Sequence, residues 1–174
     1  EEVERVKREL ERLLEENDEH SKEVEKRIRD LDRKAEELLR EIEERLRRSD
    51  ERLKRLLERG TDEDELRKRI KKSEDEVREL IKKLTRVLEE ILKRTKELAD
   101  RDKKHVRDVE KRVRELDVEE RVLKKVEDDL RESEKRVEEV LRKNEETVRR
   151  LKEELRKVLE DHKRTVEELR RRLT

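Results

Sequence analysis

The sequence predicts an all-α protein, folded as an elongated antiparallel bundle of three long helices. Charged residues make up 63% of the 174 residues, and one glycine and no proline are present to interrupt a helix. Apolar residues recur three and four positions apart, as they do along one face of an α-helix. Two short stretches break this recurrence and divide the chain into three segments.

The apolar residues also argue against intrinsic disorder, which is the first alternative for a chain so rich in charge. Each of the three segments holds 16 apolar residues. This is a narrow stripe, widened in places by neighbouring apolar pairs such as Val87 and Leu88. Such pairs suit a helix that contacts two partners. The simplest arrangement is therefore one up-down-up bundle, a single domain spanning residues 1–174.

The first helix is expected at about residues 2–59. It ends before Gly60, which suits the left-handed residue that terminates many helices, and the loop covers about residues 60–62. Its seam, the line of residues expected to face the core, comprises Val3, Val6, Leu10, Leu13, Asn17, Ser21, Val24, Ile28, Leu31, Ala35, Leu38, Ile42, Leu46, Ser49, Leu53 and Leu56.

The second helix is expected at about residues 63–115. Thr61 or Asp62 can cap it, and acidic residues fill its first turn. Its seam comprises Leu66, Ile70, Ser73, Val77, Leu80, Leu84, Val87, Ile91, Thr95, Leu98, Asp102, His105, Val109, Val113 and Leu116.

The third helix is expected at about residues 118–173, after a loop at about residues 116–118. Asp117 followed by Glu120 has the spacing of a capping box, with Asp in the cap role. The seam of this helix comprises Leu123, Val126, Leu130, Ser133, Val137, Val140, Asn144, Val148, Leu151, Leu155, Val158, His162, Val166, Leu169 and Leu173. The mean seam step lies between about 3.5 and about 3.6 residues, which predicts a coiled-coil-like, nearly straight bundle with weak left-handed supercoil.

Polar residues in the seams fall at matching heights. Folding the chain at Gly60 makes residues of the first two helices level when their numbers sum to about 122. Folding it again near Asp117 offsets the third helix from the first by about 112. These relations gather one set of polar residues, with Asn17 beside His105 and Asp129, His20 beside Asp102, and Ser21 beside Ser133.

A second polar set is expected where Ser49 meets Ser73 and His162. A weaker third candidate joins Thr85 and Thr147 beside Ala35, while Thr95 and Asn144 have no evident partner. An unpaired buried polar group costs about 1–3 kcal/mol, and co-located donors and acceptors remove that cost. We interpret both sets as buried hydrogen-bond networks that fix helix register, because a slipped pairing would leave their members unsatisfied.

These features together resemble de novo designed helical bundles with buried hydrogen-bond networks. They are the even apolar split, the equal counts of 55 basic and 55 acidic residues, the two short loops and the layered polar residues. The resemblance covers the whole chain and implies a structural or scaffold role without a natural biochemical activity. Natural three-helix rods such as spectrin-type repeats typically carry buried aromatic residues, which are absent here. Charged single-helix rods lack a continuous apolar seam.

Two chemical hypotheses concern the first polar set. Asp102 and His105 share one helical face, and His20 and Asp129 could complete a metal site, but the serines and Asn17 are poor ligands, so no metal is expected. The letters of a Ser-His-Asp triad occur without a substrate pocket or oxyanion donors, so no catalysis is expected.

The histidines raise the third hypothesis, a pH switch, because protonation would place charge in the core. His162, with only serines expected near it, is the more plausible weak point. Asp102 and Asp129 would oppose switching at the other two histidines.

The expected partners follow from charge and composition. Basic and acidic residues are interspersed, which argues against nucleic acid, and no apolar run is long enough to span a membrane. No cofactor is expected, and the chain is expected to be a monomer of unknown localisation, without a targeting signal and with recombinant cytoplasmic expression as the expected setting. The alternative is a module that completes a four-helix or larger bundle with a partner helix or a second copy. Its supports are the unpaired Thr95 and Asn144 and an outward-facing second apolar column on the second helix, comprising Ile81, Leu88, Leu92, Ala99 and Val106.

Overall fold

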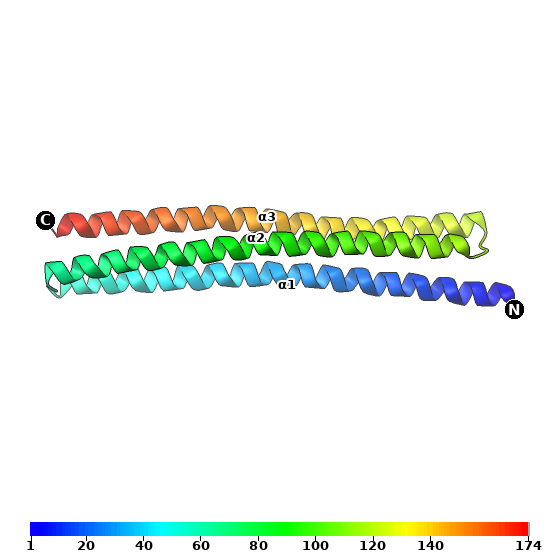
Figure 1. Ribbon diagram of the computed structural model, residues 1–174, viewed down its shortest axis with the longest axis horizontal. Helices are drawn as coiled ribbons and strands as arrows, with labels where there is room; N and C mark the ends of the chain where they lie inside the picture. Colours follow the sequence, from blue (N-terminus) through cyan, green and yellow to red (C-terminus); the bar gives the residue numbers. More distant parts are fainter. Residues whose placement is uncertain (174) are drawn as a thin grey trace. The chain divides into compact units, whose positions relative to one another are not determined.

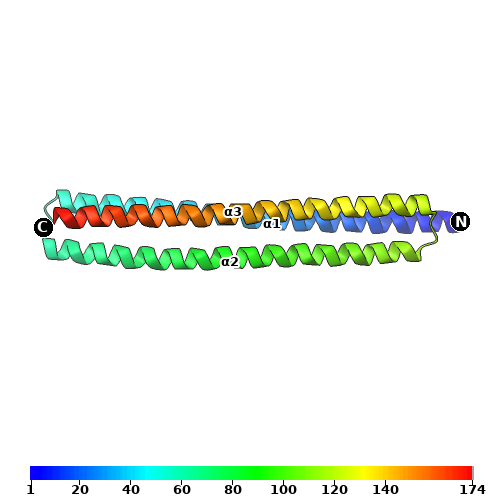
Figure 2. The same cartoon turned by 90° about the horizontal axis from the view of Figure 1, so that it is seen from above.

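The computed structural model describes residues 1–173 and contains three α-helices, α1 (Glu2–Glu58), α2 (Glu63–Glu115) and α3 (Glu120–Arg172) (Figure 1). Figure 2 shows the same three helices from above, with the turn that joins α1 to α2 and the linker that joins α2 to α3. The all-α class predicted from the seams is confirmed.

The turn after α1 depends on its glycine. Gly60 has a φ of 72°, in the left-handed region, and its N–H donates to the carbonyl of Leu57 at 3.2 Å. The N–H of Thr61 donates to the carbonyl of Leu56, also at 3.2 Å. These two bonds form a Schellman motif, which satisfies carbonyls that the end of the helix would otherwise leave unpaired.

α2 begins directly after this turn. The carbonyl of Asp62 accepts the N–H of Leu66 at 2.9 Å, so Asp62 occupies the cap position in preference to Thr61. Three acidic residues follow in the first turn, where they complement the positive end of the helix dipole: Glu63, Asp64 and Glu65.

α3 begins two residues later than the sequence predicted. Its first helical hydrogen bond ends on the carbonyl of Glu119, so the expected cap at Asp117 is wrong. The physical reason lies in Val118, whose N–H donates to Leu116 at 3.0 Å and whose side chain packs against the core. This contact keeps residues 116–118 outside the helix.

The described chain divides into two compact units, each containing a segment of every helix. Unit 1 comprises Glu1–Asp32 and Leu92–Glu146, and unit 2 comprises Arg33–Ile91 and the chain from Thr147 onward. Within each unit the three helices contact one another, which makes the fold a three-helix bundle.

The core of unit 1 consists of two apolar clusters. The first cluster contains Leu10, Leu13, Val106, Val109, Val113, Val126 and Leu130. The second contains Val24, Ile28, Ala99, Val137 and Val140. Between the clusters the α1 numbers rise as the α2 numbers fall, so these segments of α1 and α2 are antiparallel, as predicted from the short turn.

The core of unit 2 is built in the same way from all three helices. One cluster near the α1–α2 turn contains Leu53, Leu66, Ile70, Val166 and Leu169. Fully burying a side chain of this kind contributes about 1.5–3 kcal/mol, so the apolar seam supplies the main driving force for folding.

The structure corrects the predicted seam of α2 at its neighbouring pairs. Three residues of the column expected to face outward are buried. Leu88 is 0% exposed, and Ala99 and Val106 are each 2% exposed. Val87, which was placed in the seam, is instead 38% exposed. The outward-facing second column is therefore wrong for these three residues. At each such pair, the buried residue is the one four positions after the preceding seam residue, and not the one three positions after it. This residue faces the core of its own unit.

Candidate functional site

Six polar residues of unit 1 form a group that we call the first polar layer. Four of them are buried and linked by a directed chain of hydrogen bonds across all three helices: Asn17, Ser21, Asp102 and Ser133. The other two, His20 and His105, are half-buried. The hydroxyl of Ser21 donates to Oδ1 of Asp102 at 3.0 Å, because a carboxylate accepts. That leaves Ser133 as the donor in its 2.6 Å bond to Ser21. Ser133 in turn accepts Nδ2 of Asn17 at 3.3 Å. Each bond in such a series polarises the next.

The two histidines of the first polar layer differ in their surroundings. Nδ1 of His20 lies 3.2 Å from Oδ1 of Asp102, so this nitrogen carries a proton and donates it to the carboxylate. The ring of His105 stacks on that of His20, with ring centres 4.0 Å apart and an angle of 12° between planes. Burial and then the neighbouring His20 lower the pKa of His105 from its ordinary value.

The first polar layer is only partly satisfied. Asp102 is 0% exposed, yet its Oδ2 has no hydrogen-bond partner among the described residues, and the same holds for Oδ1 of Asn17 and Nδ1 of His105. Burial, Glu138 and the charge of Asp102 together raise the pKa of nearby Glu134. A buried carboxylate with one bare oxygen is costly, so the layer depends on the bonds that Asp102 does receive.

Asp129 lies outside the first polar layer, contrary to the sequence-based expectation. Its side chain is exposed, because the next residue, Leu130, takes the core position on α3. Asn17 also differs from expectation, since it bonds to Ser133 and not to His105.

The Ser21, His20 and Asp102 side chains do not have the connectivity of a catalytic triad. A triad needs the histidine as the base that receives the serine proton. Here Ser21 gives its proton directly to Asp102, and His20 donates to the same carboxylate oxygen. The group is a shared acceptor with two donors.

A second polar layer in unit 1 joins two residues for which the sequence suggested no partner. Thr95 and Asn144 are both 0% exposed, and the Thr95 hydroxyl lies 2.9 Å from Oδ1 of Asn144 and 3.0 Å from the Leu92 carbonyl. Nδ2 of Asn144 donates to a carboxylate oxygen of Asp32. This bond orients the Asn144 amide, because only its NH₂ group can face the carboxylate.

A third polar layer lies in unit 2 and consists of two separate pairs. Ser49 and Ser73 are 2.9 Å apart through their hydroxyls, and Nδ1 of His162 lies 3.0 Å from Oδ1 of Asp50. His162 is 3% exposed, and its Nε2 has no hydrogen-bond partner among the described residues. The sequence placed His162 against serines alone, and the carboxylate corrects that expectation.

Sequence reasoning missed Asp32 and Asp50 because only seam positions were compared. Both follow the offset between the first and third helices, since Asp32 bonds Asn144 and Asp50 bonds His162, each 112 residues away. Extending the comparison to the residue beside each seam position would have found them. The weaker candidate at Thr85 differs again, because its hydroxyl donates to the Ile81 carbonyl of its own helix at 2.8 Å.

The described residues offer few other sites. Over residues 1–173, no group of three or more His, Asp or Glu side chains is placed to hold a metal ion. No helix within those residues has the length and apolar character needed to cross a membrane.

Comparisons with known proteins give a distant likeness to a solved structure. No family model matches the chain, and no curated protein matches it. Among solved structures, one described as "Computationally designed three helix bundle" aligns at 17% sequence identity over 98% of this chain and 83% of that chain, with a TM-score of 0.38. The three-helix bundle and its buried polar hydrogen bonds are defined by the chain's own contacts.

Proposed function

We propose that this chain is a structural module, a helical scaffold without a catalytic role, whose polar layers specify the register and pairing of its helices. The observation that carries the proposal is the directed hydrogen-bond chain of the first polar layer, which draws one member or more from each helix. An interaction that needs all three helices at one height disfavours other pairings.

A slip of α1 by one heptad would disrupt the first polar layer. Moving α1 by seven residues would replace Ser21 with Ile28 opposite Asp102. Asp102 would then lose the hydroxyl that donates to it while remaining buried. Leaving a buried acceptor without its donor costs about 1–3 kcal/mol, whereas an all-leucine seam would slip at little cost.

The test is to convert the hydrogen-bonded chain of the first polar layer to apolar residues and to follow helix pairing as well as stability. The variant carries Asn17→Leu, Ser21→Ala, Asp102→Leu and Ser133→Ala. We expect it to stay helical and at least as stable, because an apolar replacement of a buried charge network is often neutral or stabilising. We expect it to populate more than one oligomeric state, measured by light scattering and by the number of amide signals in NMR spectra.

The matched control is Asp129→Leu, the same change at an exposed aspartate of α3. It should leave a single species with one set of amide signals. If the apolar variant also remained a single species with unchanged signals outside the substituted sites, the layer would not specify pairing and the proposal would be wrong.

The alternative of a module that binds a partner helix keeps fewer supporting features, because only Ile81 and Leu92 of the second apolar column are partly exposed. Thr95 and Asn144 bond each other and Asp32 within the chain. Leu88 and Ala99 face the core of their own units. The structural role is therefore the better supported of the two.

A further inference from the structure

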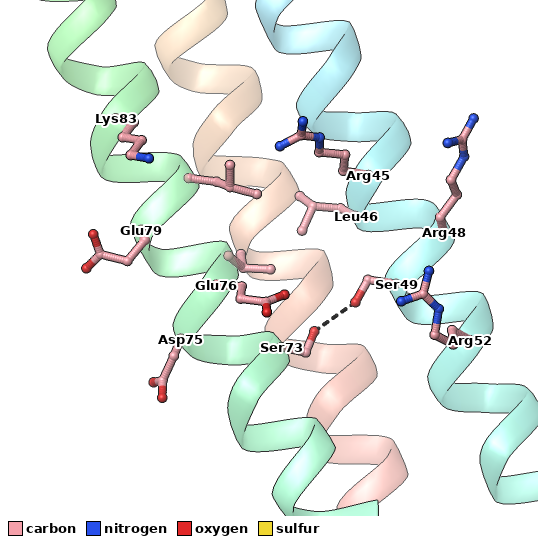
Figure 3. Close-up of a pocket in the computed structure, with 12 residues that line it drawn as sticks. Arg45, Leu46, Arg48, Ser49, Arg52, Ser73, Asp75, Glu76, Glu79 and Lys83 are labelled. Atoms are coloured by element: carbon pink, nitrogen blue, oxygen red, sulfur yellow. Dashed lines mark hydrogen bonds between the residues drawn. The ribbon is translucent and has the colours of Figure 1, made fainter.

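A hollow of about 600 Å³ lies between α1 and α2 in unit 2. Its apolar lining comprises Leu46, Val77 and Leu80, and the hydrogen-bonded hydroxyls of Ser49 and Ser73 lie between the two helices (Figure 3). The hollow exists because two serines meet where leucine-sized side chains would fill the space between the helices. Its volume lies within the roughly 300–1,000 Å³ of ordinary ligand sites.

Unpaired cations surround this hollow. In the part of the chain that the structure describes, Arg45, Arg52 and Lys83 make no ion pair or side-chain hydrogen bond. Figure 3 shows Arg45 reaching toward the space between α1 and α2 and Arg52 lying beside Ser49, and Lys83 belongs to the α2 side of the lining. By contrast, Arg48 points away and bonds Glu44 at 3.3 Å. Three charged groups without partners leave the mouth of the hollow electropositive.

The acidic residues of the lining offset this charge only in part. Glu76 points into the space, whereas Asp75 and Glu79 point away from it (Figure 3). Three cations therefore face one carboxylate across the hollow. A metal cation would be repelled here, and a neutral apolar ligand would cover the cations without pairing them.

We propose that this hollow binds an amphipathic organic anion, with its apolar body on Leu46, Val77 and Leu80 and its anionic head between Arg45 and Arg52. Guanidinium groups suit carboxylate, sulfonate or phosphate heads because they donate two parallel hydrogen bonds. The Ser49–Ser73 bond uses one of the two hydroxyl protons, and the other can reach a head-group oxygen. This binding activity is separate from the scaffold role and stands or falls independently of it.

The probe is 8-anilinonaphthalene-1-sulfonate, followed by its fluorescence at low salt. Its neutral analogue N-phenyl-1-naphthylamine has the same aromatic body without the sulfonate. We expect one saturable sulfonate site per chain. The double variant Arg45→Gln/Arg52→Gln should weaken sulfonate binding roughly tenfold and leave the neutral analogue unchanged, because only the head group meets the arginines.

Two further variants separate the site from general effects. Arg5→Gln/Arg29→Gln makes the same charge change at two exposed arginines of α1 that also have no ion pair among the described residues. It should bind the sulfonate like the unchanged chain. Ser49→Leu places a large side chain in the hollow and should abolish binding of both probes, with helix content checked by circular dichroism.

Three binding results would overturn the proposal. These are no saturable binding of the sulfonate, equal weakening by both arginine double variants, or unchanged binding in a folded Ser49→Leu chain. A solution mass above the 21.7 kDa of one chain that falls when the sulfonate is added would assign the hollow to a second copy, and would also overturn it.

Discussion

Ser21 is the residue on which the first polar layer depends, because it passes the hydrogen-bond chain from Ser133 to Asp102. Its replacement by Ala removes one of two donors to a carboxylate that is 0% exposed and leaves the Ser133 hydroxyl without its acceptor. Ser49, by contrast, bonds only Ser73 and is partly exposed, so water can replace that contact.

We therefore predict that Ser21→Ala lowers the free energy of unfolding by about 1–3 kcal/mol, and that Ser49→Ala lowers it by less than about 1 kcal/mol. Chemical denaturation of both variants under the same conditions measures the difference. Equal losses would show that the connection through Ser21 to Asp102 adds nothing beyond an ordinary hydroxyl contact.

His105 links stability to pH. Its pKa is lowered in the folded chain, by burial first and by His20 second, although Asp102, Asp108 and Glu16 act in the opposite direction. A lowered histidine pKa means that the unfolded chain binds the proton more readily. The stability that His105 contributes is therefore complete above the unfolded pKa of about 6.5 and is lost as pH falls through the folded pKa.

We predict that His105→Gln flattens the pH dependence of the free energy of unfolding below about pH 6.5, relative to the unchanged chain. His20→Gln should flatten it in part, because His20 is the second cause of the lowered pKa. Denaturation midpoints measured at several pH values between about 7.5 and 5 provide the comparison. An unchanged slope in His105→Gln would contradict the assignment.

At the scale of the helix, the position of the α2 seam can be tested at one pair of neighbours. Leu88 is 0% exposed and Val87 is 38% exposed, although the sequence placed Val87 in the seam. We predict that Leu88→Ala costs about 2–5 kcal/mol of unfolding free energy, because it opens a cavity in the core. Val87→Ala should cost less than about 1 kcal/mol. Similar costs at the two positions, measured by denaturation, would mean that both residues share the core.

How far the sequence predicted the structure can be seen at particular residues. Gly60 marked the first turn, and the resulting register brings His20 to Asp102 and Ser49 to Ser73, as the structure does. The sequence did not show which member of an apolar pair is buried. Val87 and Leu88 have similar hydrophobicity and are neighbours around the helix. Which of the two residues is buried depends on the positions of both neighbouring helices. The periodicity of a single helix carries no information about those positions.

The candidate site was predictable to a smaller extent. The expected pairing of Asn17 with His105 is wrong. The Asn17 side chain extends beyond its own level along the helices and bonds to Ser133 instead. Asp32 and Asp50 were not predicted, because an aspartate next to a seam position is ordinarily an exposed surface residue. Their carboxylates bond buried polar groups through a short side chain at the edge of the core.

For the whole molecule, surface charge contributes solubility more than stability. The 55 basic and 55 acidic residues cancel, and most ion pairs join exposed residues three or four positions apart on one helix, as Arg67 does with Glu63 at 2.8 Å. Such pairs contribute only about 0.3–0.5 kcal/mol each and weaken in salt. With no net charge to keep chains apart, self-association depends on how completely the apolar residues are buried.

We predict that the chain is a monomer, with a light-scattering mass that stays near 21.7 kDa across a concentration series at about pH 7.4 and again at about pH 5. The physical reason is that, within residues 1–173, the large hydrophobic side chains classed as exposed are Val3 and Val87 alone. Stable dimers commonly bury about 800 Å² per partner, which two separated valines do not supply.

Each departure from a constant mass has a distinct meaning. A dimer at about pH 7.4 would contradict the self-contained bundle and would mean that chains complete one another. A mass that changes only at about pH 5 would assign association to protonation of His20, His105 or His162, since these are the side chains whose ordinary pKa lies between the two conditions. Repeating the series with His105→Gln would then separate the stacked pair from His162, because His162 bonds Asp50 in unit 2 and is untouched by that change.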